Sequence, residues 1–405
     1  MLKIEVKELT KIFGKNPKVG IKLLEEGKTK TDILKETGMT VGVNRVSFEV
    51  NSGEIFVIMG LSGSGKSTLV RLINRLIEPS SGSVFIDGID LAKMDKHELI
   101  KTRRKKLSMV FQKFGLFPHR TILENTGFGL EVQGIDKKEI KEKALKSLKM
   151  VGLSGYEDQY PSQLSGGMQQ RVGLARALAN DPDILLMDEA FSALDPLIRK
   201  EMQDELIDLQ SSMKKTIIFI THDLDEALKI GDRIALMKDG VIVQIGTPEE
   251  IMTSPANDYV KKFVQDVDRS KVFSAQHVMI RPETIQVEKD GPRTALQRMR
   301  QAEISSIYAI NKNKELMGIV TADAASEAIK NGNKDIYGII QTDVPVVMPD
   351  LPLNDLFNVI YNSPVPVAVV EEKKLKGIII RGAVLAALAG NEVNQDDSNT
   401  PNTHS

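Results

Sequence analysis

A glycine-rich loop between a strand-like run and a helical pattern constrains this chain more than any other feature. The run GEIFVIMG is apolar and has the length of a strand buried on both faces of a parallel sheet. The loop GLSGSGKST fits the pattern G-x-x-x-x-G-K-[ST], and the helical pattern STLVRLINRLI begins within it. In such a loop, backbone N–H groups and the helix N-terminus surround phosphate oxygens. We expect a phosphate site formed by Gly60, Ser62, Gly63, Ser64, Gly65, Lys66, Ser67 and Thr68.

The pattern around this loop predicts an α/β domain. The apolar runs DILLMDE and TIIFITHD alternate with helical stretches such as KKEIKEKALKSLKMVG and QQRVGLARALAN. Strands that alternate with helices form a mostly parallel sheet, here expected within residues 1–265. The chain has no cysteine, which excludes disulfides and thiolate metal sites, and its net charge of −1 provides no basic field for nucleic acid.

No part of the sequence predicts a membrane span. The longest apolar runs have strand length, whereas a spanning helix needs about 20 apolar residues. The start, MLKIEVKELTKIF, lacks the apolar core of a secretory signal. We therefore expect a chain that does not cross a membrane by itself.

Polar side chains follow three predicted core strands. Gln112 follows one, Asp188 and Glu189 end another, and His222 follows a third. Ligands of open α/β sheets bind outside the carboxyl ends of the strands, so these residues are expected near the phosphate loop. Each residue also has a simpler interpretation: the two acids could be solvated, the histidine structural and the glutamine merely exposed. The nearby phosphate loop argues against this simpler interpretation for the acids and the histidine.

Phosphoryl transfer needs mainly positioning and charge neutralisation, which this set can supply. Lys66 would neutralise the β- and γ-phosphates, and Ser67 and Asp188 would bind Mg²⁺. Glu189 would polarise the attacking water, and His222 would contact the γ-phosphate.

Residues 15–42 interrupt a region that is otherwise typical of β-strand. They predict two short helices, the first ending at Gly27 and the second capped by Thr29 or Thr31 and ending at Gly38. A DNA-binding helix-turn-helix is the alternative, but six lysines against four acidic residues form a weak positive balance.

The C-terminal part contains a repeat. SSIYAINKNKELMGIVTADAASEAI and VPVAVVEEKKLKGIIIRGAVLAAL align at an offset of 59, which pairs Tyr308 with Val367 and Gly318 with Gly377. Each unit reads as helix, strand, turn, strand, helix, and the units span residues 270–332 and 338–390. The polar segment 391–405 carries acidic residues without lysine or arginine and is expected to be disordered.

A second serine–glycine loop, LSGGMQQR, begins at Leu164, and with it residues 1–265 resemble the nucleotide-binding subunit of ABC transporters. In this resemblance Phe13 is the adenine-stacking aromatic, residues 60–68 are the Walker A loop, and Asp188–Glu189 is the Walker B pair. Gln112 matches the Q-loop and a further Mg²⁺ contact, SALD up to Asp195 matches the D-loop, and His222 matches the H-loop. LSGGM matches the signature LSGGQ, with Met168 in place of the usual glutamine.

The resemblance implies a head-to-tail dimer with shared ATP sites. Ser165, Gly166 and Gly167 of one copy would cap the γ-phosphate bound by the second copy. The fold class implied is an α/β P-loop NTPase domain of the ABC type, followed by an α+β pair of CBS modules, which the C-terminal repeat resembles.

The segment FQKFGLFPHRTILENTGFGLEVQG resembles the importer branch, and with the insertion and the CBS pair the whole chain resembles the ATP-binding subunit of glycine betaine/proline osmoprotectant importers. This implies ATP and Mg²⁺ as cofactors and a polytopic permease as partner, with a substrate-binding domain on that permease or on a separate protein. It also implies a place at the cytoplasmic face of the membrane. Proline, carnitine or choline as substrate, and a soluble ABC ATPase without a transport role, are the alternatives.

The CBS modules depart from the adenosine-binding pattern G-x-x-[ST] followed by Asp. The first has Thr321 but Ala324, and the second has Ile380 and Ala383. This disfavours AMP or ATP between the modules and leaves cyclic di-AMP at a dimer-level surface open. The sequence has two basic clusters, KTRRKK (Lys101–Lys106) and KKLK (Lys373–Lys376). Each is either an ordinary solvated face or a contact with an anionic membrane. Such a contact would respond to ionic strength, because salt screens the attraction.

Overall fold

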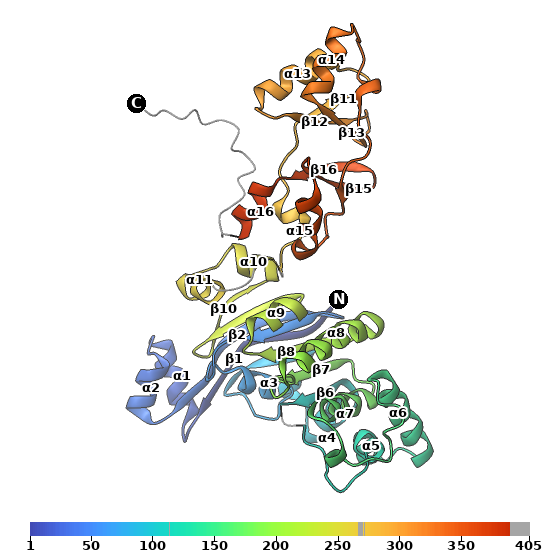
Figure 1. Cartoon of the computed structure of the whole chain (residues 1–405). Helices are drawn as coiled ribbons and strands as arrows, with labels where there is room; N and C mark the ends of the chain where they lie inside the picture. Colours follow the sequence, from blue (N-terminus) through green and yellow to red (C-terminus); the bar gives the residue numbers. More distant parts are fainter. Residues whose placement is uncertain (113, 266–269, 271, 389–405) are drawn as a thin grey trace. The chain divides into compact units, whose positions relative to one another are not determined.

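The computed structural model describes residues 1–112, 114–265, 270 and 272–388. The chain divides into two compact units, residues 1–267 and 268–405 (Figure 1). The predicted tail 391–405 lies outside the described residues. Within the part of the chain that is described, no helix is long and apolar enough to cross a membrane.

The first unit is built on a six-stranded sheet with the order β10-β9-β3-β8-β7-β6. Neighbours from β9 to β6 are parallel, and only β10 pairs antiparallel. This confirms the predicted α/β class with a mostly parallel sheet. The strands are β3 Ile55–Met59, β6 Leu107–Phe111, β7 Ile184–Asp188, β8 Thr216–Thr221, β9 Arg233–Lys238 and β10 Val241–Gly246.

A second, antiparallel sheet with the order β2-β1-β4-β5 completes the strands of this unit. Its strands are β1 Leu2–Phe13, β2 Thr40–Asn51, β4 Ser81–Ile86 and β5 Ile89–Asp90. Phe48 of β2 stacks on Phe56 of β3 at 4.9 Å between ring centroids, so one apolar core joins the two sheets.

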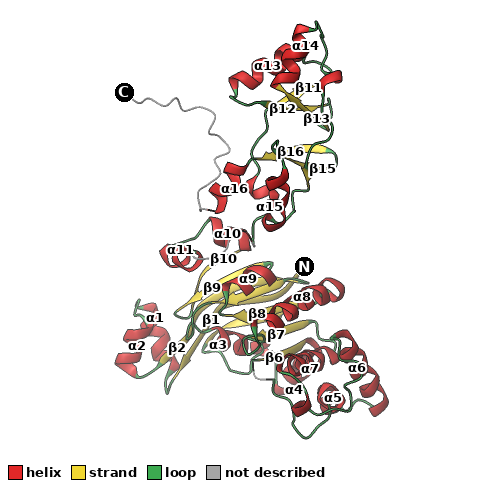
Figure 2. Cartoon of the chain, viewed as in Figure 1, coloured by secondary structure: helices red, strands yellow, loops and turns green. Residues whose placement is uncertain are grey.

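Helices pack around these sheets (Figure 2). They are α3 Lys66–Ile73, α4 Lys96–Lys106, α5 Ile122–Val132, α6 Lys137–Met150, α7 Gly166–Ala179, α8 Pro196–Met213, α9 Leu224–Ile230, α10 Pro248–Thr253 and α11 Asp258–Val264. Helix α3 follows the phosphate loop directly, and α8 and α9 begin just after β7 and β8. Three helix N-termini therefore lie near the carboxyl ends of the central strands.

The insertion forms two helices, α1 Pro17–Glu25 and α2 Lys30–Thr37. Of the two predicted caps, Thr29 is the one that caps α2, through a reciprocal capping box with Asp32. The last helical residue of α1 is Glu25, and Gly27, with φ of 83°, is the left-handed glycine of the predicted stop. Its N–H donates to Leu24 O at 3.1 Å, and Lys28 N–H donates to Leu23 O at 3.0 Å. Gly38, with φ of 70°, ends α2 in the left-handed conformation that glycine adopts without strain.

The second unit contains the two predicted repeats. The first has β11 Thr284–Gln286, α13 Pro292–Gln301, β12 Ser306–Ile310, β13 Leu316–Thr321 and α14 Ala322–Lys330. The second has β14 Val346–Val347, α15 Leu353–Asn362, β15 Val367–Glu371, β16 Lys374–Ile379 and α16 Arg381–Leu388, and the short helix α12 Ala275–Val278 precedes both. The short parallel strands β11 and β14 were not predicted.

The constant offset of 59 between the repeats is wrong for the first strand of each hairpin. Ala309 faces Gly318 in the first hairpin, whereas Val369 faces Gly377 in the second, so the first strands correspond at an offset of 60. The cause is the hairpin loop, which is shorter in the second repeat. The two hairpin turns also join each other, since Leu316 N–H donates to Lys373 O at 2.9 Å and Leu375 N–H donates to Lys314 O at 3.1 Å.

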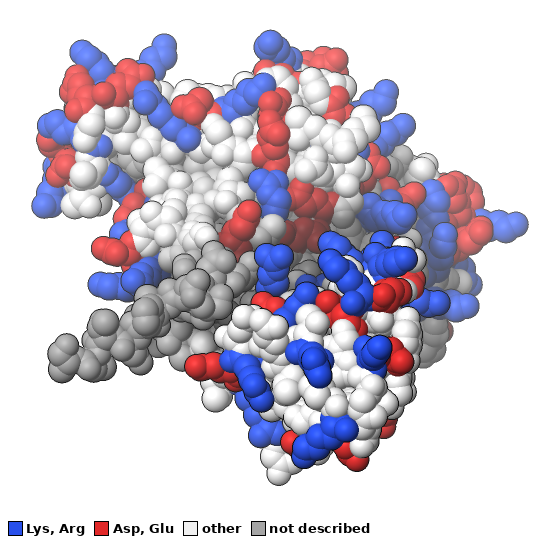
Figure 3. All heavy atoms as spheres, turned by 90° about the horizontal axis from the view of Figure 1, so that it is seen from above, with Lys and Arg blue, Asp and Glu red and all other residues white. Residues whose placement is uncertain are grey.

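Charged side chains are mixed over the face of the molecule in Figure 3, where Lys and Arg lie among Asp and Glu. This distribution agrees with the net charge of −1. It offers no continuous basic surface on that face for the backbone of a nucleic acid.

Candidate active site

The phosphate loop has a backbone that only glycine fits at two points. A Cβ on Gly60 would lie 2.2 Å from the Met237 carbonyl oxygen, and one on Gly65 would lie 2.3 Å from that of Gly42. Both glycines have positive φ, 150° and 107°. The loop therefore packs closely against β9 and β2 at these two glycines, where a larger residue would clash.

Two polar side chains of the phosphate loop, those of Lys66 and Ser64, are buried within it. Lys66 Nζ donates to the carbonyl oxygens of Gly60 at 2.7 Å and Leu61 at 3.2 Å. Burial lowers the pKa of Lys66, with Glu189 and Asp188 acting in the opposite direction. The hydroxyl of Ser64 is buried and has no hydrogen-bond partner in the described structure. The charge of Lys66 and the N-terminus of α3, which begins at that residue, are what make the loop fit a nucleotide phosphate.

Asp188 lies at the end of β7 next to the start of α3. Ser67 Oγ donates to Asp188 Oδ1 at 3.0 Å. Burial is the largest cause of the raised pKa of Asp188, and the Ser67 hydrogen bond opposes it. A buried carboxylate beside a hydroxyl is a pair of hard oxygen ligands, and Mg²⁺ needs only one or two carboxylates when phosphates complete its shell. The residues therefore fit Mg²⁺ although the described part of the chain holds no cluster of three acidic or histidine ligands.

Glu189, Gln112 and His222 meet in one cluster. His222 Nδ1 lies 3.3 Å from Glu189 Oε2, and Gln112 Nε2 lies 3.4 Å from the same oxygen. Gln112 Nε2 also donates to Ser192 Oγ at 3.1 Å, a contact that the sequence did not predict. These side chains come from the ends of β6, β7 and β8, so the parallel sheet brings together the polar residues predicted at its strand ends.

Phe13 lies at the end of β1, beside the start of α3. It is 40% exposed, and Lys11 Nζ lies 5.2 Å from its ring centroid. A Cβ on Gly42 would stand 2.8 Å from the Phe13 ring and 3.3 Å from Thr68 Cγ2. The ring is therefore next to the phosphate loop's last residue and leaves part of its surface open for stacking.

The second loop occupies a different place. Ser165 caps α7, its hydroxyl accepting from Met168 N–H at 3.3 Å, and Asp195 caps α8 by accepting from Ile198 N–H at 3.1 Å. A Cβ on Gly167 would lie 2.5 Å from Ile198, so the two caps are packed together. Across the described residues, no hydrogen bond joins Ser165 or Asp195 to the phosphate loop of the same chain.

Comparison with family models gives two matches. Residues 43–192 match the ABC transporter model, and residues 275–331 and 334–390 match the CBS domain model.

The chain is 64% identical over 394 residues to the glycine betaine/carnitine transport ATP-binding protein GbuA of Listeria monocytogenes, covering 97% of this chain and 99% of that protein. It is 61% identical over 401 residues to the glycine betaine transport ATP-binding protein OpuAA of Bacillus subtilis, covering 98% and 96%. The chain belongs to the ABC transporter ATP-binding proteins of this glycine betaine group. It is an ABC-type ATPase with tandem CBS domains, as predicted.

A solved structure shares the fold of the first unit. The ATP-binding cassette MJ0796, a dimer in a post-hydrolysis state bound to ADP and phosphate, is 34% identical with a TM-score of 0.51. The match covers 60% of this chain and 98% of that one. The ABC transporter ATP-binding proteins use ATP and Mg²⁺, which agrees with the fit of the phosphate loop and of the Ser67–Asp188 pair.

Proposed function

We propose that this chain is the ATP-hydrolysing subunit of an importer for compatible solutes, with glycine betaine as the substrate. The observation that carries the proposal is the near full-length likeness to proteins named for glycine betaine transport. Carnitine, which appears in the name of one relative, is the second candidate, and proline and choline are further ones. No observation favours the soluble, non-transport alternative.

The site residues divide the chemistry among them. Lys66 and the loop N–H groups hold the β- and γ-phosphates, and Phe13 stacks on the base. Ser67, Asp188 and Gln112 would hold Mg²⁺, which would neutralise negative charge of the phosphates. Glu189 orients and polarises the attacking water, and His222, whose Nδ1 is 3.3 Å from Glu189 Oε2, donates to the γ-phosphate.

Two copies of the chain form the complete sites in this proposal. Ser165, Gly166 and Gly167, with Asp195, act on the nucleotide of the second copy. Two observations support this: Ser165 and Gly166 are exposed at the N-terminus of α7, and the cassette of similar fold is a dimer. An exposed helix N-terminus can bind the γ-phosphate of a partner's nucleotide.

The chain acts at the cytoplasmic face of the membrane, bound to a polytopic permease. A substrate-binding domain on the permease or on a separate protein delivers the solute. The test is reconstitution of the complex in vesicles, with ATPase rate measured against each candidate solute. Stimulation by glycine betaine at lower concentration than by carnitine, proline or choline is expected, and the absence of stimulation by all four would contradict the proposal.

The CBS pair regulates the motor in this proposal, through ionic strength at an anionic membrane or through a nucleotide. The Thr321 hydroxyl serves as the N-cap of α14, where it accepts a hydrogen bond from Ala324 N–H at 3.3 Å. With Ala324 at the acidic position, an adenosine site between the modules is disfavoured, and cyclic di-AMP at a dimer-level surface stays a candidate. Titration calorimetry with cyclic di-AMP on the full chain tests this branch.

A further inference from the structure

The helical insertion is connected at both ends to the nucleotide site. Strand β1 ends at Phe13, and β2 begins at Thr40, so the insertion lies between these two residues. Gly42 of β2 packs between the Phe13 ring and the phosphate loop, as the close approaches of Phe13 and Gly65 show. The segment between these strands is thus inserted at the wall of the site rather than at a remote loop.

The insertion is anchored by its own small apolar core. Ile33 of α2 is fully buried and packs with Ile12, Met39 and Val41 of the two strands. A Cβ on Gly20 of α1 would lie 2.8 Å from Ile12, so α1 also lies close against β1. This packing, with the Thr29 cap, holds the first residue of α2 in place relative to the sheet.

That first residue, Lys30, reaches the phosphate loop. Lys30 Nζ donates to the carbonyl oxygen of Gly63 at 3.2 Å. Gly63, with φ of 78°, is at the turn of the loop, and a bond to its carbonyl uses none of the loop's N–H donors. The contact therefore steadies the turn and brings a positive charge beside a loop that fits a polyanion.

We infer that Lys30 is a positioning residue of the nucleotide site, through which the insertion holds the phosphate loop and favours nucleotides with more phosphates. The inference rests on the proposal that residues 60–68 bind ATP. Two other lysines of the insertion differ in setting. Lys28 pairs with Glu36, and Lys35 is exposed on α2, which makes it a control of equal charge.

The experiment measures Mg·ATP and ADP binding to the full-length chain by titration calorimetry, for wild type, Lys30→Gln, Lys30→Arg and Lys35→Gln. Because the contact is solvent-exposed, Lys30→Gln should weaken ATP binding by about fivefold and ADP binding by less. Lys30→Arg should restore most of the affinity, and Lys35→Gln should stay close to wild type. In steady state, KM for ATP should rise while kcat changes little.

Two results would overturn the inference. One is unchanged ATP affinity in Lys30→Gln, and the other is an equal loss for ATP and ADP that Arg does not rescue and that accompanies a lower Tm without nucleotide. Lys66→Ala separates this inference from the site proposal. Normal ATP binding by Lys66→Ala would refute the site itself, whereas loss of binding there with an unaffected Lys30→Gln would refute only the role of Lys30.

Discussion

At the residue scale, Glu189 has a backbone conformation that few residues other than glycine adopt. Its φ is 48°, just after β7, and its N–H donates to Ile220 O at 3.0 Å. Strained non-glycine residues persist where the surrounding structure fixes them, often at functional sites. The Glu189 carboxylate lies within 3.4 Å of both Gln112 and His222.

The first prediction concerns Glu189→Gln. The amide keeps the size of the side chain but cannot act as a base, so turnover should fall by at least about a hundredfold. ATP binding and the proposed head-to-tail dimer should persist, as measured by nucleotide trapping and size-exclusion chromatography. Near-normal ATPase in this variant would show that another group activates the water.

The second prediction concerns Asp188→Asn. Burial raises the pKa of Asp188, so the charged form destabilises the nucleotide-free fold, and this cost grows as pH rises through the raised pKa. Asp188→Asn should therefore be more stable than wild type at neutral pH, by about 1 kcal/mol in the free energy of unfolding, and should melt at a higher temperature. This difference should shrink as pH falls toward the ordinary pKa of an aspartate. Mg²⁺-dependent ATP binding should be lost in the same variant. Thermal melts at several pH values test this, and a variant less stable than wild type at neutral pH would contradict it.

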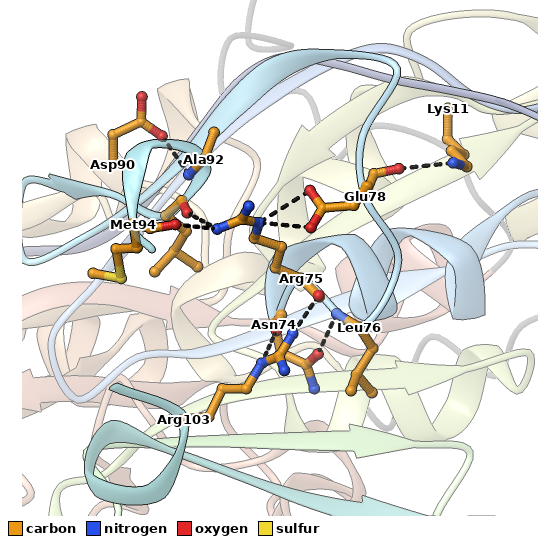
Figure 4. Close-up of polar contacts among 10 residues, drawn as sticks. Lys11, Asn74, Arg75, Leu76, Glu78, Asp90, Ala92, Met94 and Arg103 are labelled. Atoms are coloured by element: carbon orange, nitrogen blue, oxygen red, sulfur yellow. Dashed lines mark hydrogen bonds and ion pairs between the residues drawn. The ribbon is translucent and has the colours of Figure 1, made fainter. Parts of the chain in front are cut away.

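At the element scale, α4 shows why a charge cluster in a sequence is not a surface patch. Arg103 donates from Nε to Asn74 O at 2.8 Å and also contacts Arg75 O, so it satisfies carbonyls at the C-terminus of α3 (Figure 4). Lys106 pairs with Asp87. Of the predicted cluster, the exposed cations are Lys101, Arg104 and Lys105.

The third prediction compares Arg103, which is bonded within the fold, with the exposed cations of α4. Arg103→Met should lower the free energy of unfolding by about 1–3 kcal/mol, because it leaves carbonyls of α3 unpaired. Neutralising Lys101, Arg104 and Lys105 together should change stability by less than about 0.5 kcal/mol. If α4 contacts an anionic membrane, this triple variant should reach full ATPase at lower salt in anionic vesicles, since screening has less attraction to overcome. A salt curve identical to wild type would show that these cations are ordinary solvated residues.

Elements with a strong local signal were predictable, and those fixed by distant contacts were not. The phosphate loop, the alternating strands and helices, and the two repeats have periodic patterns or turn residues of their own. Strands β11 and β14 have three and two residues, too short for a pattern, and exist because β12 and β15 offer a free edge. The contacts Gln112–Ser192 and Lys30–Gly63 join residues 80 and 33 positions apart, and no local pattern encodes them.

At the scale of the whole molecule, the separation of the two loops within one chain is what a shared site requires. Ser165 and Asp195 are used as local helix caps, which fixes their backbone without involving the phosphate loop of the same chain. The N-terminus of α7 remains exposed beside these caps. In the head-to-tail dimer proposed above, the N-terminus of α7 in each copy would meet the phosphate loop of the other copy.

The last prediction tests this with mixed dimers of Lys66→Ala and Ser165→Arg chains. If sites are shared between copies, each heterodimer has one site with both defects and one site with neither. Random mixing should then leave about a quarter of all sites intact, whereas each variant alone has none. Site-resolved nucleotide trapping after subunit exchange measures this fraction. If each site instead belonged to a single chain, every site in the mixture would carry one defect, and trapping in the mixture would equal the average of the two separate variants.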